Sequence, residues 1–247
     1  MIQLSKRLGA VANLAGEARV VADVGTDHGY IPVYLISSGK AEKAIAMDVN
    51  EGPLLRAKEH IRQFHLEAQI ETRRSDGLIG LQPKEAEVLV IAGMGGALMM
   101  RILDEGKDAA HAAKRLVLQP QSELLSFRRY LMEHGYQITE EDMVYEDGKF
   151  YSMMAARWAK DGTRNAYVED DVWGEWAKIG PSSLKYGALL IARRHPVLRQ
   201  YLEYQRAQKQ KILKCLGENA RQDVSKRKEQ ILLELSEIDG LLGLWQT

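Results

Sequence analysis

The sequence has a single cysteine, Cys215, so it can form no internal disulfide and no cysteine-rich metal site. It also lacks any apolar run of about 18 to 20 residues, the length that crosses a bilayer, and its first residues lack the apolar core of a signal peptide. We therefore expect no membrane contact, no metal and a cytoplasmic location. The sequence does not indicate which protein partners the chain has.

The chain also has no net charge, because its 34 basic side chains balance 34 acidic ones. This balance hides an asymmetry along the chain. Residues 1–180 carry 22 basic and 27 acidic side chains, whereas residues 181–247 carry 12 and 7. The C-terminal part is therefore positive, which favours a polyanionic partner. With 45% hydrophobic residues the chain can fill a sizeable core, as one large domain or as a domain with an appendage.

The first strongly patterned segment is a short apolar strand, Val20–Val24, that leads into a glycine turn. Asp23 lies at the end of this strand, and the turn has the spacing Gly25-x-x-x-Gly29. A helix over 30–38 is expected next, since its proline lies near the start, where a missing amide hydrogen is harmless. Strand, glycine turn and helix are typical of a doubly wound sheet, whose ligands bind beyond the carboxyl ends of the strands.

The same unit recurs along the chain. Further strands are predicted at Lys43–Met47, Gln69–Arg73, Glu87–Ala92 and Arg115–Gln119. Helices are predicted at Ile2–Ala15, Asn50–His65, Ala97–Glu105 and Ser122–His134, the first of them covering an edge of the sheet. Tyr136–Tyr145 and Lys149–Ala159 are expected to form an antiparallel hairpin around an Asp-Gly turn. Five strand–helix units followed by an antiparallel pair are an unusual and therefore specific order.

The C-terminal segment changes character and contains no proline after Pro196. Apolar residues recur there at three- and four-residue steps, which predicts two antiparallel helices in a coiled-coil hairpin. The predicted seam consists of Leu198, Leu202, Ile212 and Leu216 in the first helix and Val224, Ile231, Leu235, Ile238 and Leu242 in the second. Its basic residues are Arg193, Arg194, Arg199, Arg206, Lys209, Lys211, Lys214, Arg221, Lys226, Arg227 and Lys228. Such charges often only solvate a helix, but beside an acidic domain they favour a grip on the phosphates of a polyanionic partner.

Several motifs together resemble the class I S-adenosylmethionine-dependent methyltransferases, and within them the bacterial tRNA adenine-22 N1-methyltransferases. The motifs are Asp23-Val24-Gly25-Thr26-Asp27-His28-Gly29-Tyr30, Ser75-Asp76-Gly77, Ile91-Ala92-Gly93-Met94-Gly95-Gly96, Leu118-Gln119-Pro120-Gln121 and the helical C-terminus. The resemblance implies a Rossmann-like α/β sheet of seven strands with a reversed last strand. It also implies S-adenosyl-L-methionine as cofactor and methyl transfer to N1 of an adenine in tRNA.

Three acids at predicted strand ends are the candidate cofactor ligands. Asp48 lies 19 residues after Gly29, at the position from which an acid accepts the ribose hydroxyls in this architecture. Asp76, with Gly77, is placed by the resemblance at the adenine. Asp23 is expected to receive the ammonium group directly or through water, while the two glycines of the turn let the methionine portion lie against the backbone. The alternatives are a helix cap for Asp48 and simple turn or strand-end roles for the other two acids.

The turn Gly93-Met94-Gly95-Gly96 departs from the pattern of amino-group methyltransferases, which keep a polar residue, two prolines and an aromatic there. Only backbone carbonyls and the Met94 thioether can face cofactor or base from this turn. Gly93, Met94 and Gly95 are therefore predicted cofactor contacts, and a tight packing turn is an equally good interpretation.

Positioning is expected to dominate the chemistry, because adenine N1 already carries an in-plane lone pair and needs no base. The methylated base is cationic, so Asp27 is the candidate that stabilises it or accepts the N6 proton afterwards. His28 could contact the base or the methionine carboxylate, and Tyr30 could stack on an extruded adenine. Structural roles are the alternatives for all three residues.

The predicted substrate contacts are Lys6, Arg7, Tyr30, Arg193, Arg194 and Lys209. The expected division is a cofactor-binding methyltransferase domain over residues 1–160 and a helical tRNA-binding domain over 161–247. A small-molecule methyltransferase, and a non-catalytic nucleoside-binding module with a coiled-coil partner site, remain the alternatives.

Overall fold

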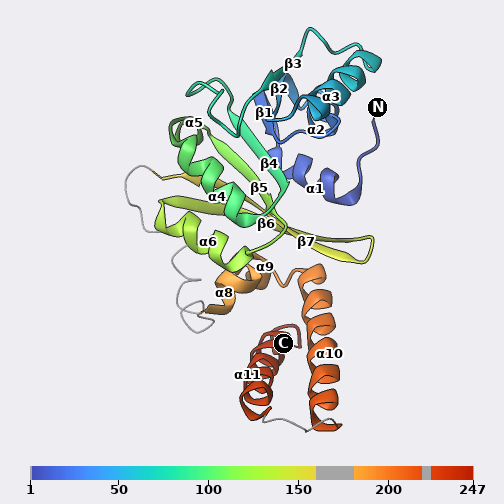
Figure 1. Cartoon of the computed structure of the whole chain (residues 1–247), viewed down its shortest axis with the longest axis vertical. Helices are drawn as coiled ribbons and strands as arrows, with labels where there is room; N and C mark the ends of the chain where they lie inside the picture. The colour runs from blue at the N-terminus through green and yellow to red at the C-terminus, as the bar shows by residue number, and fades with distance from the viewer. Residues whose placement is uncertain (1, 160–180, 219–223, 247) are drawn as a thin grey trace.

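A seven-stranded sheet forms the centre of the protein in the computed structural model, which describes residues 2–159, 181–218 and 224–246 (Figure 1). The strands are β1 (Ala18–Val24), β2 (Ala41–Asp48), β3 (Ile70–Arg74), β4 (Val88–Met94), β5 (Arg115–Pro120), β6 (Tyr136–Glu146) and β7 (Lys149–Trp158). Their order is β3-β2-β1-β4-β5-β7-β6, and β7 runs antiparallel to both of its neighbours. This confirms the predicted Rossmann-like sheet with a reversed last strand.

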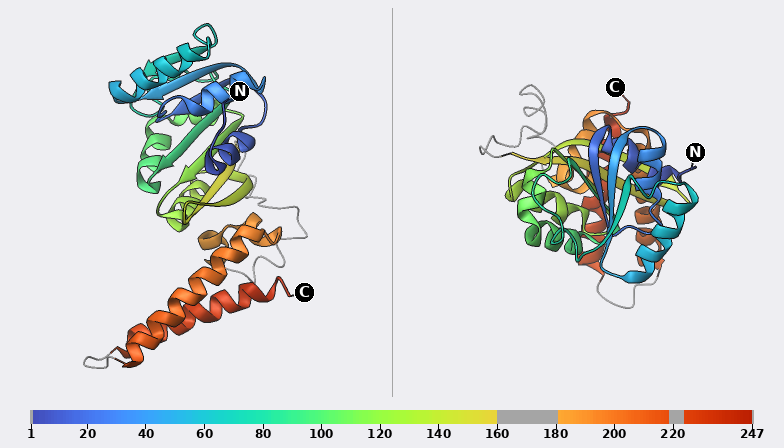
Figure 2. Two further views of the ribbon diagram at one scale, coloured as in Figure 1. Left: turned by 90° about the vertical axis from the view of Figure 1, so that its right-hand side faces the viewer. Right: turned by 90° about the horizontal axis from the view of Figure 1, so that it is seen from above.

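Helices cover both faces of the sheet (Figure 2). One face carries α1 (Lys6–Ala15), α2 (Tyr30–Ser37) and α3 (Glu51–Gln63), and the other carries α4 (Gly96–Glu105), α5 (Lys107–Ala112) and α6 (Leu124–Glu133). Successive strand residues serve opposite faces, so Val21 packs with α1 and α2 while Ala22 packs with α4. The strands are apolar on both sides because both sides are covered.

The N-terminal helix differs from its prediction in two ways. It begins at Lys6 rather than Ile2, because the Ser5 hydroxyl accepts a hydrogen bond from the Leu8 amide and caps the helix there. It contacts the edge strand β6, as predicted, but it also extends over the face of the sheet, against Val90 and Val117 of the central strands. The prediction was incomplete on this point because amphipathic spacing identifies a buried stripe but not the surface that buries it.

Within residues 181–218 and 224–246, which the structure describes, four helices follow the sheet: α8 (Pro181–Tyr186), α9 (Ala188–Ala192), α10 (Pro196–Glu218) and α11 (Ser225–Gly243). The last two form the predicted antiparallel hairpin, which projects away from the sheet (Figure 1). The short helices α5, α8 and α9 were not predicted, because helices of five or six residues are too short to show a periodic pattern.

The predicted seam of the hairpin is only partly buried. Leu202 of α10 and Ile231, Leu235 and Ile238 of α11 are buried, but Ile212 is 41% exposed. The seam is therefore closed near the sheet and opens along the far half of α10.

A buried ion pair joins the helical segment to the sheet. Arg128 of α6 donates from Nε to Glu141 Oε1 of β6 over 2.8 Å, and both side chains are fully buried. The guanidinium also donates to the carbonyl of Leu184 in α8, while Glu141 Oε2 accepts the amide of Leu189 in α9. Gly187 between these helices has a φ of 96°, and a Cβ there would lie 2.7 Å from Glu141 Oε1. We call this group the buried joint.

The predicted domain boundary, between residues 160 and 161, lies outside the described residues. One apolar core runs from the sheet through α9 into the hairpin, where Leu198 and Ile238 belong to it. A second contact, from His195 Nε2 to Asp142 Oδ1 at 3.1 Å, attaches the start of α10 to β6. The division into two domains therefore stays a prediction.

Candidate functional site

Three acidic residues lie at the carboxyl ends of adjacent strands. Asp23 is in β1, Asp48 ends β2, and Asp76 follows β3. The main chain ties the three strand ends together. The carbonyl of Met47 accepts the amides of both Gly25 and Thr26 at 2.8 Å, and the carbonyl of Asp48 accepts the amide of Ser75 at 3.0 Å. The structure thus brings the three predicted cofactor ligands to one edge of the sheet.

Asp23 is the buried member of this group, with 6% of its surface exposed. Burial raises the pKa of Asp23 to about 6, and the negative charge of Asp48 adds to the effect. The nearby Thr26 hydroxyl opposes it in part, although this buried oxygen makes no hydrogen bond of normal geometry among the described residues. A buried carboxyl beside an unsatisfied hydroxyl is suited to a cationic, hydrogen-bonding ligand.

Two glycine-containing turns, those of Gly25 and Gly93, line the same cavity as Asp23. Gly25 has a φ of 74°, and a Cβ at this position would lie 1.9 Å from Cε of Met94. Gly93 has a φ of 82°, and a Cβ there would approach Arg7 and Gln121 to 3.7 Å. Residues 93–96 thus pack tightly: Met94 lies against Gly25, while Gly95 and Gly96 lie against Ser122. Their contact with a cofactor stays a prediction.

A cavity of about 300 Å³ opens between these turns. Its walls are Arg7, Leu8, Asp23, Gly25, Asp27, Tyr30, Ile31, Ala92, Gly93 and Gln121. Arg7 is held in place by donating to Oε1 of the buried Gln119 over 2.9 Å. The predicted residues Asp23, Asp27, Tyr30 and Arg7 thus share one space, with a carboxylate at one side and a guanidinium at another.

The turn before α2 carries the predicted catalytic residues. Asp27 is 68% exposed and pairs with Arg56 of α3 at 2.9 Å. The rings of His28 and Tyr30 are stacked with centroids 5.3 Å apart, and His60 meets Tyr30 edge-on at 5.0 Å. His28 has a φ of 60°, and its carbonyl lies 2.9 Å from His60 Nδ1, which fixes the turn against α3. Gly29 caps α2 in the left-handed conformation.

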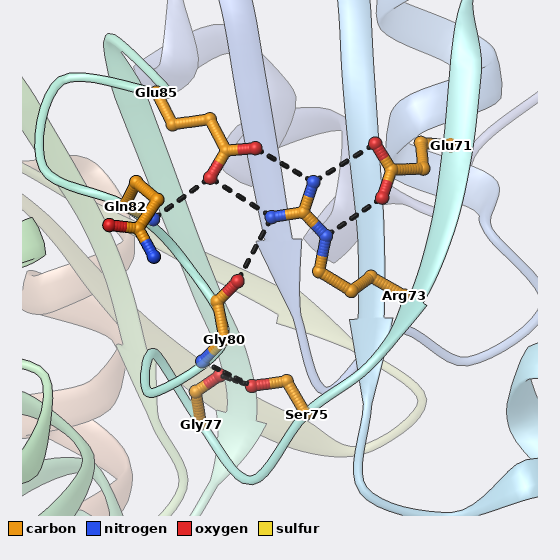
Figure 3. Close-up of polar contacts among 7 residues, drawn as sticks. All are labelled: Glu71, Arg73, Ser75, Gly77, Gly80, Gln82 and Glu85. Carbon is orange, nitrogen blue, oxygen red and sulfur yellow. Dashed lines mark hydrogen bonds and ion pairs between the residues drawn. The ribbon is translucent and has the colours of Figure 1, made fainter.

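The loop after β3 is shaped by an arginine between two glutamates (Figure 3). Arg73 contacts Glu85 at 2.7 Å and Glu71 at 2.8 Å, and it also donates to the carbonyl of Gly80. These pairs raise the pKa of Arg73, mainly through Glu85, and Arg73 in turn lowers the pKa of Glu85. The Ser75 hydroxyl donates to the Gly77 carbonyl and accepts the Gly80 amide, which closes the turn.

Asp76 and Gly77 sit at the start of this loop. Gly77 has a φ of 59°, and a Cβ there would touch Ile102 of α4 at 3.0 Å. Asp76 pairs with Arg101 of α4 at 3.1 Å, and both side chains are about half exposed. The adenine-binding role of Asp76 stays a prediction, in which the base would share the carboxylate with Arg101.

The remaining predicted substrate residues lie in two places. Lys6 begins α1, where its amide donates to Glu146 at the end of β6. Arg193 and Arg194 are exposed between α9 and α10, whereas Lys209 is mostly buried and pairs with Glu234 across the helical hairpin. Lys209 therefore has a structural partner, and its contact with RNA stays a prediction. Arg221 lies outside the described residues.

Sequence reasoning missed three residues of the site: Arg56, Gln119 and Gln121. The two glutamines are part of a motif that supported the resemblance, but their residue type gave no hint of which would be buried and which would face a ligand. Arg56 lies in the middle of a polar helix face and carries no local pattern. Among the described residues, no three His, Cys, Asp or Glu side chains gather as a set of metal ligands, and no helix could span a membrane.

Comparison with known proteins identifies the family of the chain. Residues 4–154 match the model of a methyltransferase domain family. The tRNA (adenine(22)-N(1))-methyltransferase of Bacillus subtilis is 37% identical over 180 residues, which cover 73% of this chain and 74% of that protein.

Solved structures extend the likeness to nearly the whole chain. The crystal structure of the Bacillus subtilis m1A22 tRNA methyltransferase TrmK has a TM-score of 0.76 at 29% identity and covers 98% of this chain and 100% of that one. Streptococcus pneumoniae Sp1610 in complex with S-adenosyl-L-methionine has a TM-score of 0.78 at 28% identity, covering 97% and 100%. With its reversed last strand and its acids at three successive strand ends, the chain belongs to the class I methyltransferases, in the bacterial tRNA (adenine-22-N1)-methyltransferase family.

Proposed function

We propose that this protein uses S-adenosyl-L-methionine to methylate N1 of an adenine in tRNA, at position 22 by analogy with the Bacillus subtilis relative. The observation that carries the proposal is the cavity whose walls include the buried carboxyl of Asp23 together with Arg7, Tyr30 and Gln121. With a tRNA substrate, the proposed location of this activity is the cytoplasm.

The residues at the strand ends fit S-adenosylmethionine in chemical type. Asp23, buried and without a cationic partner among the described residues, would hold the ammonium group. Asp48 would accept the ribose hydroxyls and Asp76 would receive the exocyclic amine of the adenine. The cofactor would be bordered by the Met94 thioether and by the backbone of five glycines: Gly25, Gly29, Gly77, Gly93 and Gly95. His28 would lie at the methionine end of the cofactor. Bound there, the cofactor supplies an electrophilic methyl group.

The cavity walls would position the target base. N1 of adenine is on the Watson–Crick edge, so the base must leave a paired stem before it can enter. Tyr30 offers an exposed ring face for it, and Gln121 offers an amide that can pair with its edge. The carboxylate of Asp27 would stabilise the positive charge that the base gains, while Arg56 orients this carboxylate. Holding the reacting groups in line supplies the rest of the rate enhancement.

The helical hairpin would hold the body of the tRNA. Arg193 and Arg194 are exposed at its base, next to the sheet, and Lys211 and Lys214 are exposed along α10. Contacts of this kind read phosphates and shape rather than sequence, so binding should weaken steeply as salt rises. In this proposal residues 1–160 carry the chemistry and residues 161–247 carry the grip.

The direct test is incubation of the protein with unmodified bacterial tRNA and methyl-labelled cofactor, followed by mapping of the modified nucleotide. We expect one methyl group per tRNA, on N1 of adenine 22, and none on free adenosine. Methylation of free adenosine but not of tRNA would replace this proposal with the small-molecule alternative. Failure to bind S-adenosylmethionine would remove the methyltransferase proposal altogether.

The role of Asp27 can be tested separately, because its ion pair with Arg56 can be removed from either side. Asp27→Asn should lower kcat by about tenfold or more with unchanged cofactor affinity, since a charge near a forming cation is worth about one to several kcal/mol. Arg56→Met is the matched control, because it removes the partner but keeps the carboxylate. Equal losses in both variants would mean that Asp27 acts only through the ion pair that orders the turn.

A further inference from the structure

A second hollow lies beside the cavity and is not used by the chemistry described above. It measures about 390 Å³, which is within the range of small-ligand sites. Its walls come from the end of β5 and the start of α6, from the β6–β7 turn and the first residues of β7, and from the first half of α10. Four of its lining residues are aromatic: Phe150, Tyr151, Tyr201 and Tyr204. We call it the aromatic groove.

The rings of the groove leave a face open to solvent. Phe150 is the centre of the cluster, with Tyr201 at 5.1 Å and Tyr204 at 5.8 Å between ring centroids. Tyr204 is 50% exposed, whereas a ring that only filled a core would be covered. The exposed Lys149 stands at the rim. Open aromatic faces beside a cation are the chemistry with which proteins hold unpaired nucleotides.

The groove is continuous with the cavity that holds Asp23. Gln121 lines both spaces. Tyr151 lines the groove, and its ring centroid lies 5.5 Å from the guanidinium of Arg7, which lines the cavity. A strand of RNA whose target adenine enters the cavity would therefore lead its neighbouring nucleotide towards the groove. In Figure 1 the β6–β7 turn lies near the start of α10, where the hairpin meets the sheet.

We propose that the aromatic groove binds one unpaired nucleotide of the RNA substrate, adjacent to the target adenine, by stacking its base on Tyr204 and placing its phosphate near Lys149. This inference rests on the proposed function and adds to it. The flanking nucleotide is drawn out together with the target, so the enzyme selects RNA in which both can leave the stack. An adenine in a continuous stem is then a poor substrate even at the correct distance from the hairpin.

The test uses Tyr204→Ala, with Tyr204→Phe as the variant that keeps the ring. Tyr204→Ala should raise KM for tRNA roughly tenfold through lost stacking, with kcat and affinity for S-adenosylmethionine unchanged. Tyr204→Phe should behave as the wild type. Leu233→Ala, at a 67% exposed apolar position on α11 outside the groove, is the matched control and should also behave as the wild type.

A direct readout places the fluorescent base 2-aminopurine beside the target adenine in the tRNA. Binding to the wild type should quench it by stacking, and binding to Tyr204→Ala at saturating protein should not. Unchanged KM and unchanged quenching in Tyr204→Ala would overturn the groove proposal while wild-type methylation of tRNA still stands. Absence of tRNA methylation by the wild type would instead overturn the proposed function.

Discussion

The strand-end site and the buried joint both place carboxylates in the interior, but they treat them differently. Glu141 of the joint is fully enclosed and meets a guanidinium, and its second oxygen accepts a backbone amide. Asp23 of the site is almost as buried, yet it forms no ion pair with a cation among the described residues, and its pKa is raised to about 6. The joint satisfies its charge within the chain, whereas Asp23 has no such partner among the described residues. In the proposed function, the charge of Asp23 is satisfied by the bound cofactor.

The largest effect should come from breaking the joint. Arg128→Met leaves Glu141 buried without its partner, and we expect the free energy of unfolding to fall by about 3–5 kcal/mol. Denaturant titration measures this loss. Arg128→Met combined with Glu141→Leu should recover much of the stability, because it removes the unpaired charge. A double variant as unstable as the single one would show that packing, and not charge, dominates the joint.

The charge of Asp23 should make stability depend on pH in the opposite sense to a salt-bridged aspartate. Its pKa is raised from 3.8 to about 6, so the folded protein holds the proton more tightly than the unfolded chain. This contribution to stability is complete below pH 3.8 and is lost as pH rises to about 6, a change of about 3 kcal/mol.

Denaturant unfolding of the cofactor-free protein between pH 4.5 and 7.5 checks this. Asp23→Asn should be more stable than the wild type at pH 7, and the difference should shrink towards pH 4.5. Affinity for S-adenosylmethionine should weaken in the wild type as pH falls through about 6, because the ammonium group then meets a neutral carboxyl. Parallel stability curves for the two proteins would mean that Asp23 titrates normally.

Gly25→Ala should affect the site without affecting the joint. A left-handed alanine costs about 1–2 kcal/mol, and the new Cβ displaces the Met94 side chain that lies 1.9 Å from its position. We expect cofactor affinity, measured by calorimetry, to fall at least about tenfold while the circular dichroism spectrum is kept. Gly148→Ala is a useful comparison, because it has a similar φ of 77° but no heavy atom within 4 Å of its Cβ. An equal loss of affinity in both variants would assign the effect to backbone strain alone.

The smallest effect is expected at Lys209, whose pair with Glu234 is less enclosed than the joint. Lys209→Met should cost about 1 kcal/mol or less in stability. Lys214→Met, at an exposed basic position on the same helix, should leave stability unchanged but reduce the salt dependence of tRNA binding. A larger loss of tRNA affinity for Lys209→Met than for Lys214→Met would show that the ion pair opens to reach RNA.

The contrast between the strand-end site and the buried joint also explains which features could be predicted from the sequence. The strands and the acids at their ends follow local rules, so Asp23, Asp48 and Asp76 could be expected at one edge from apolar runs that stop at an acid and a glycine. Arg128 and Glu141 lie 13 residues apart in unrelated elements, and nothing local marks either as buried. Arg7 was predicted as a contact from its charge alone, but its support by Gln119, 112 residues away, depends on how α1 packs on the sheet. Side-chain partners across elements require the folded structure.

Strand β6 sets the distance between the attachment points of α10 and α1. Asp142 anchors the start of α10, and Glu146, four positions further along, accepts the amide of Arg7 at the first turn of α1. An extended strand advances about 3.3 Å per residue, so the two anchor points are set about 13 Å apart. The helical hairpin, which is proposed to hold the tRNA, and the Arg7 guanidinium at the cavity are thereby held at a fixed spacing. A one-residue insertion between Asp142 and Glu146 would move the helical hairpin relative to the cavity while leaving the structure of each part unchanged.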